Sequence, residues 1–207
     1  GASGHKGFAF AYGVSGLFIP AALSVVLTIS EGGFIKMVDG NPQLDYGALF
    51  TSRLSWAIVV LAVVAVLYIS AVFLTWYASR AGDKSASELM RKYALIWAAP
   101  LILAAFGIII EMRALHNWHY NNMLNVWWLF VISGILFIVT IWLIANRKKY
   151  GLAVILLIMQ FAAAFFAYGI SHYPYLLYPY LSIEGSFTSK AMAIALVVAF
   201  VAGLALL

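Results

Sequence analysis

The sequence predicts an all-α protein, a polytopic transmembrane bundle of about six membrane-spanning helices. Of its 207 residues, 65% are hydrophobic and only 9% are charged, whereas about a quarter of the residues of a soluble domain are charged. Six long segments contain no charged side chain, and a helix needs about 20 apolar residues to cross a bilayer. These segments are continuously apolar, unlike the strands of a membrane β-barrel, in which apolar and polar residues alternate.

The predicted spans cover residues 7–30, 54–79, 93–110, 124–146, 150–170 and 191–207, and the third and sixth are the shortest. The whole chain, residues 1–207, is expected to form a single transmembrane helical domain. Because it begins at Gly1 without a methionine and is still apolar at Leu207, we expect it to be the C-terminal part of a longer polypeptide.

The basic residues are divided unevenly between the two sets of connections. One face receives Lys6, Arg80, Lys84, Arg91, Lys92, Arg147, Lys148 and Lys149, and the other receives Lys36, Arg53, Arg113 and Lys190. By the positive-inside rule the first face is cytoplasmic, so both ends of the chain are expected inside the cell. This topology accounts for the net charge of +5 without a nucleic-acid partner. The absence of cysteine excludes disulfides and thiolate ligands.

The first half of the chain carries several local signals. Pro20 lies in the middle of the first span, where a proline usually kinks a buried helix. Gly and Pro in residues 31–53 indicate turns and not another span. After the second span, Ser85 or Ser87 is expected to start a helix with Glu88 in its first turn. This part should form an amphipathic extension on the cytoplasmic surface.

Residues 171–189, here called the Tyr-Pro segment, connect the last two spans. They contain Tyr-Pro-Tyr-Leu twice, at 173–176 and 178–181. Each proline removes a backbone donor and biases the preceding tyrosine toward extended geometry. The segment is therefore expected to be extended, as a rigid loop on the outer membrane face. Its four tyrosines suit the boundary between lipid tails and headgroups.

Three histidines near the predicted outer face are candidate site residues. His116 and His119 could share a helix face with Glu111 nearby, which would suit a metal or haem ligand set. The alternative is that both histidines are polar residues of the membrane interface. His172 begins the Tyr-Pro segment and either titrates near neutrality or holds the segment by a hydrogen bond.

Four other polar residues stand at or within the spans. Glu31, Glu111 and Arg113 are candidate polar or proton-path contacts, because ionisable groups at membrane depth are functional candidates. The alternative is that they extend to the headgroups. Gln160, deep in the fifth span, is expected to make an interhelical hydrogen bond, with a quinone contact as the second possibility. No histidine lies in mid-span, so no haem ligand is expected on this chain, and no soluble-enzyme motif is present.

The Tyr-Pro segment resembles a segment of a known family. Residues 168–176, with Pro179, 182–183 and 187–188 following, are similar to the stretch before the last helix of subunit II of cytochrome bd-type quinol oxidases. Looser similarities lie at 12–24 with 31–34, and at 68–74 with the Arg80-Ala81-Gly82 turn and Arg91. The specific part of this resemblance is the Tyr-Pro segment, with His172, Tyr173, Pro174, Tyr175 and Pro179 as its loop residues.

The resemblance implies a two-subunit terminal oxidase that oxidises quinol and reduces dioxygen to water. Haem b and haem d would be carried by the partner, subunit I, and this chain would be the haem-free subunit that supports it. A structural or substrate quinone is a further implied cofactor, and membrane lipids are further partners. The implied location is the inner (plasma) membrane of a prokaryote. The family's first helices, which carry acidic groups linked to proton uptake, have no counterpart in this sequence.

Two other functional hypotheses compete with that of an oxidase subunit. A secondary transporter would build its site from helices broken near the midplane, and Pro20 and Pro100 are compatible with such breaks. Acidic coupling residues within the spans are absent, however. The third reading is a passive membrane scaffold.

Overall fold

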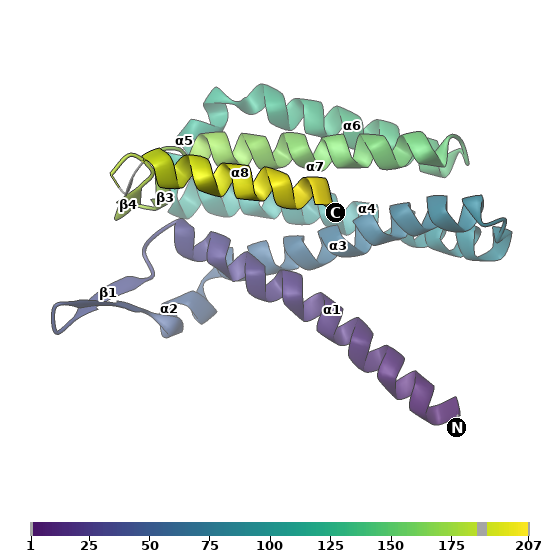
Figure 1. The fold of residues 1–207 in the computed structure, drawn as a ribbon, viewed down its shortest axis with the longest axis horizontal. Coiled ribbons are helices and arrows are strands. Elements are labelled where there is room, and N and C mark those ends of the chain that lie inside the picture. The colour runs from purple at the N-terminus through teal and green to yellow at the C-terminus, as the bar shows by residue number, and fades with distance from the viewer. Residues whose placement is uncertain (1, 186–189, 207) are drawn as a thin grey trace.

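The computed structural model describes residues 2–185 and 190–206, and within them it is a helical bundle (Figure 1). Two antiparallel pairs of helices form its body. The first pair is α3 (Arg53–Arg80) and α4 (Lys84–Leu115), and the second is α6 (Trp127–Ala145) and α7 (Tyr150–His172). Helix α1 (Ala2–Ser30) packs on α3 through its C-terminal part, and its N-terminal part diverges from the bundle.

The predicted transmembrane helical bundle is confirmed. Among the described residues, five helices are long and apolar enough to cross a membrane: α1, α3, α4, α6 and α7. The sixth predicted span, 191–207, forms α8 (Lys190–Leu206), whose 17 described residues lie at the lower end of the length range of spanning helices.

The predicted helix start at Ser85 or Ser87 is wrong. Asp83 is the N-cap, and its side chain accepts a hydrogen bond from the Ala86 backbone N–H at 2.9 Å. From there α4 continues for 32 residues without a break. The predicted amphipathic extension therefore forms the first turns of α4, continuous with the third span, because no helix-terminating signal separates the two.

Residues 31–53 form turns and not a span, as predicted. Strands β1 (Ile35–Val38) and β2 (Asn41–Leu44) pair antiparallel. They are joined by Asp39 and Gly40, both with positive φ (52° and 78°), which is the backbone that a two-residue hairpin turn requires. A short helix, α2 (Tyr46–Thr51), follows and is capped by Asp45, whose carboxylate also pairs with Lys36.

The core lies where α3, α4, α6 and α7 meet. Its residues include Tyr68, Val72, Ala94, Ile144 and Ala153, all fully buried. The alanines of α4 and α7 allow neighbouring helices to approach closely, as small residues do in membrane bundles. The Tyr68 ring lies 5.6 Å from the ring of Phe137, centroid to centroid.

The Tyr68 hydroxyl provides a test of this packing. It is buried and has no hydrogen-bond partner among the described residues. We expect Tyr68→Phe to leave the free energy of unfolding unchanged or to raise it by about 1 kcal/mol, because an unpaired buried hydroxyl only adds a desolvation cost. Tyr68→Ala should instead lower it by about 3–5 kcal/mol through the cavity. Thermal denaturation of the purified membrane complex would measure both, and a marked loss in Tyr68→Phe would reveal a partner for the hydroxyl.

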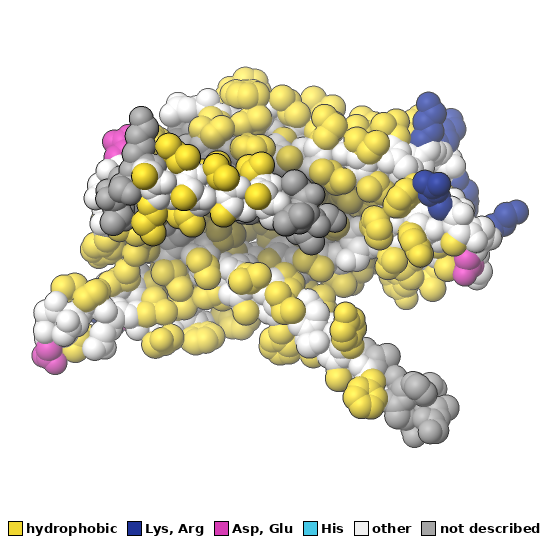
Figure 2. Space-filling model, in the orientation of Figure 1, with side chains coloured by type: hydrophobic (Ala, Val, Ile, Leu, Met, Phe, Trp, Pro, Cys, Tyr) yellow, Lys and Arg dark blue, Asp and Glu magenta, His cyan; other side chains and the backbone are white. Residues whose placement is uncertain are grey.

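One end of the bundle is strongly basic. Figure 2 shows Lys and Arg side chains gathered at the right-hand end, over the α3–α4 and α6–α7 connections. There the buried Arg91 donates to both oxygens of Glu88 at 2.9 and 2.6 Å, and Arg147 donates to the same carboxylate at 3.2 and 3.0 Å. Arg91 also reaches the Ala145 carbonyl at 3.4 Å. This network links the two helix pairs at their basic end.

Candidate functional site

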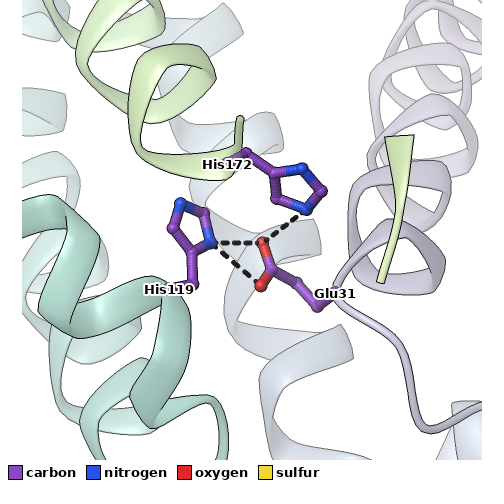
Figure 3. A group of neighbouring side chains, drawn as sticks. All are labelled: Glu31, His119 and His172. Carbon is purple, nitrogen blue, oxygen red and sulfur yellow. Dashed lines mark hydrogen bonds and ion pairs between the residues drawn. The ribbon is translucent and has the colours of Figure 1, made fainter. Parts of the chain in front are cut away.

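At the opposite end of the bundle, three separate segments bring Glu31, His119 and His172 together (Figure 3). Glu31 is the first residue after α1, His119 lies in the short helix α5 (Asn117–Asn125), and His172 is the last residue of α7. The side chains of Glu31 and His119 are completely buried, and His172 is 6% exposed. The three residues are called the Glu-His-His cluster below.

The Glu31 carboxylate is the centre of the cluster. The Nδ1 atom of His119 lies 2.8 and 2.9 Å from its two oxygens. The Tyr168 hydroxyl donates to Oε1 at 2.5 Å, and Nε2 of His172 lies 3.8 Å from the same oxygen. A fully buried carboxylate is costly unless it is paired and hydrogen-bonded, and these three neighbours supply the pairing.

The remaining ring nitrogens are held by the protein. His119 Nε2 lies 2.7 Å from Ser171 Oγ, and the Ser171 hydroxyl donates to the Tyr168 carbonyl at 2.8 Å. The Nδ1 atom of His172 donates to the Tyr175 carbonyl at 2.8 Å. Both imidazole rings are therefore fixed in orientation by hydrogen bonds outside the cluster.

Trp118 covers the cluster from the side of the Tyr-Pro segment. Its ring stacks on Tyr178 with a centroid distance of 4.1 Å and on His119 at 5.1 Å. It also meets the rings of His172 and Tyr175 edge-on, at 5.2 and 5.7 Å. This aromatic cover separates the carboxylate from its surroundings.

The sequence Glu31-Gly32-Gly33-Phe34 places the carboxylate. Gly32 and Gly33 have φ of +86° and +84°. A positive φ is incompatible with a right-handed helix, so α1 ends here, and glycine is the residue that adopts this backbone without strain. The Tyr178 backbone N–H donates to the Ser30 carbonyl at 3.0 Å. A Cβ at Gly32 would lie 2.2 Å from the Tyr178 carbonyl oxygen. The end of α1 and the Tyr-Pro segment are therefore in direct backbone contact.

The described part of the Tyr-Pro segment is not helical and contains extended backbone, as predicted, but it does not run straight. It folds back as a short hairpin of β3 (Tyr175–Leu177) and β4 (Leu181–Ser182), and both Tyr-Pro bonds are cis. Tyr173 and Tyr180 are exposed, as an interfacial position requires, but Tyr175 and Tyr178 pack inward because Trp118 offers them an aromatic surface. Residues 186–189 of the segment lie outside the described residues.

The predicted pairing of His116 with His119 does not occur. His119 is fully buried inside the protein, where it contacts Glu31 and Ser171. His116 is half-buried between α4 and α5, outside the Glu-His-His cluster, and burial lowers its pKa from the ordinary value. His172 makes a hydrogen bond to the Tyr-Pro segment, which is one of its two predicted roles.

The other candidates lie apart from the cluster. Glu111 lies inside α4, 3.5 Å from Arg53, whereas Arg113 is exposed. Gln160 is buried in α7. The interhelical bond there runs from the Ser133 hydroxyl to the Gln160 backbone carbonyl at 3.0 Å, while the Gln160 side-chain oxygen has no partner among the described residues.

Sequence reasoning did not single out Tyr168 and Ser171. A usable signal existed, because Ser171 and His172 lie three and four residues after Tyr168, but the predicted span ended at residue 170, two residues before the end of α7. Residues at these spacings share a helix face. A polar face of this kind at the end of an apolar span would have pointed to the cluster.

Comparison with known proteins places the chain in a family. Residues 2–207 match the family described as cytochrome bd terminal oxidase subunit II. A Bacillus subtilis (strain 168) protein that carries the name of a cytochrome bd menaquinol oxidase subunit II is 32% identical over 195 residues, which is 90% of this chain and 56% of that protein.

Among solved structures, a chain of the bd oxidase from Geobacillus thermodenitrificans is 54% identical, with a TM-score of 0.83. The match covers 100% of this chain and 62% of that one, so the chain spans less than two thirds of both relatives. The match to the family extends over the whole described bundle, including the cluster and the Tyr-Pro segment. The chain belongs to the subunit II family of cytochrome bd terminal oxidases.

Proposed function

We propose that this chain is the haem-free part of a terminal oxidase that oxidises quinol and reduces dioxygen to water. The observation that carries the proposal is the family match over residues 2–207. In this proposal a partner, subunit I, holds haem b and haem d and performs the redox chemistry. This chain supports that partner within the lipid bilayer.

His119 and His172 do not fit as haem ligands on this chain. An axial ligand needs a ring nitrogen free to face the iron. Both ring nitrogens of His119 contact protein oxygens, at 2.8–2.9 Å and 2.7 Å. The only free nitrogen of His172 faces the Glu31 carboxylate at 3.8 Å, which leaves no room for a porphyrin. This supports placing the haems in the partner subunit.

The helix surfaces suit a membrane complex. Large apolar side chains are exposed along α6 and α7, among them Ile135, Ile138, Phe165 and Phe166, and Figure 2 shows apolar side chains over much of the visible face. Such surface requires lipid or apolar partner helices. We assign the basic end to the cytoplasm by the positive-inside rule. The Glu-His-His cluster and the Tyr-Pro segment then lie toward the outer face of the plasma membrane of a prokaryote.

The two prolines that favoured a transporter do not break their helices. Pro20 and Pro100 lie inside the uninterrupted helices α1 and α4, whereas transporter sites are typically built from helices broken near the midplane. No such break occurs in the described parts of these two helices.

Haem content tests the proposal directly. We expect a complex purified through a tag on this chain to show a Soret band. His116→Asn, His119→Asn and His172→Asn should each retain the wild-type ratio of haem to protein in the assembled complex, because none of these rings would ligate iron. Pyridine haemochrome analysis measures this ratio. Loss of one haem in any variant, or a Soret band in the isolated chain, would contradict the assignment.

A further inference from the structure

The buried Nε2 atom of His172 has no hydrogen-bond partner among the described residues. Its ring is oriented by Nδ1, which lies 2.8 Å from the Tyr175 carbonyl. A carbonyl oxygen only accepts, so Nδ1 carries the proton of the neutral ring. The lone pair on Nε2 is then directed toward a Glu31 oxygen 3.8 Å away. Two electron-rich atoms face each other without a cation between them.

His119 is held in the same way. The Ser171 hydroxyl donates its only hydrogen to the Tyr168 carbonyl, so its oxygen accepts from His119 Nε2. In the neutral ring, the nitrogen that faces both Glu31 oxygens would also carry a lone pair. The described part of the chain places no Lys or Arg in an ion pair with Glu31. Positive charge at this point must come from protons or from a bound metal ion.

We propose that Glu31, His119 and His172 bind one divalent transition metal ion, and that Zn²⁺ is the best match. Their ligand atoms all lie within 4.8 Å of one another. Two imidazole nitrogens and one carboxylate are a common zinc set that leaves a fourth position open. Figure 3 shows the three side chains converging from three different segments. No cysteine is needed for such a site.

The surroundings have the features of a metal site. A metal-binding histidine usually donates a hydrogen bond from its second ring N–H to a carbonyl or another polar group. Metal-binding carboxylates are themselves hydrogen-bonded. Here the Tyr175 carbonyl, the Ser171 oxygen and the Tyr168 hydroxyl supply these contacts. The distance of 2.8 Å between His119 Nδ1 and Glu31 Oε1 is that of a hydrogen bond. Without metal, a hydrogen therefore lies between these two atoms. A bound metal ion would displace it, because metals bind the deprotonated form of their ligands.

The bound ion would fasten the bundle at its outer end. It would join the end of α1, the short helix α5 and the end of α7 beneath the cover of Trp118. This role is independent of the proposed oxidase reaction, because it needs neither haem nor quinol. Failure of the metal experiment would therefore leave the oxidase proposal intact.

Elemental analysis of the assembled complex tests the site. Wild type, His172→Asn and Glu111→Gln would be purified, treated with a chelator, reloaded with Zn²⁺ and analysed by mass spectrometry, with the protein concentration from amino-acid analysis as the standard. We expect the wild type and Glu111→Gln to retain about one zinc per copy, and His172→Asn to lose it about tenfold or more. Asparagine keeps a donor near the Nδ1 position and removes the Nε2 ligand, whereas Glu111 is a carboxylate outside the cluster.

X-ray absorption at the zinc edge of the wild type gives a measurement that needs no variant. It should show imidazole ligands at about 2.0–2.1 Å. The proposal is overturned if the wild type retains no more zinc than His172→Asn, or if the retained zinc shows no imidazole scattering. In either case protons alone fill the cluster.

Discussion

Glu31→Gln is expected to lower the free energy of unfolding of the complex by about 3–5 kcal/mol, the cost of breaking a fully buried carboxylate–histidine pair. The carboxylate is fully buried and receives His119 Nδ1 at 2.8 and 2.9 Å and the Tyr168 hydroxyl at 2.5 Å. A glutamine keeps the size but replaces one of the two accepting carboxylate oxygens with an NH₂ donor, so hydrogen bonds at this buried position are lost. Thermal and denaturant unfolding of the purified complex would measure the loss.

Glu111→Gln is the matched control. Glu111 also lies toward the outer end of the bundle, but its partner Arg53 is 3.5 Å away and has a side chain that is 74% exposed. The Glu111 side chain is 19% exposed, but because the Arg53 side chain is solvated, the pair is expected to contribute only about 0–1 kcal/mol. If both variants lost the same free energy of unfolding, burial of the Glu31–His119 pair would not contribute to stability.

The double variant Glu31→Gln/His119→Gln extends this experiment. If the two side chains act as one unit, the combined loss should be smaller than the sum of the single losses, because the second substitution removes a group already left unpaired. Strict additivity would contradict the direct pairing seen between them.

Gly32→Ala is expected to give the second large effect, a loss of about 3 kcal/mol or more, since it combines a strained backbone with a steric clash. The φ of +86° disfavours alanine, and the new Cβ would stand 2.2 Å from the Tyr178 carbonyl oxygen. Because that oxygen belongs to the backbone, the whole Tyr-Pro segment must move to relieve the contact. Thermal denaturation of the purified complex, together with limited proteolysis of the segment, would detect the change.

Gly33→Ala separates the two causes. Gly33 has nearly the same φ, +84°, but nothing lies within 4 Å of the position of its Cβ. Its substitution should therefore cost only the left-handed strain of about 1–2 kcal/mol. If both alanine variants lost the same stability, the backbone contact between α1 and the Tyr-Pro segment would not contribute.

Most of the fold was accessible from the sequence because it depends on local properties. Uninterrupted apolar runs predicted the spanning helices, and the glycines after Glu31 together with Asp39-Gly40 indicated turns between the first two spans. The error at Ser85 and Ser87 has a local cause as well, since Asp83 is an equally good cap two residues earlier. The uneven distribution of Lys and Arg predicted a basic end, and the structure has one.

The sequence by itself determined that this protein is a membrane bundle and which family it resembles, since length, hydropathy and a specific segment are enough for both. Only the tertiary structure decided that Glu31 meets His119, 88 residues away, and that His172 completes the cluster. Hydrophobic periodicity states which residues enter the bilayer but not which helix ends meet. That depends on how the end of α1 packs against α3 and β3, and on how Tyr175 and Tyr178 pack inward against Trp118.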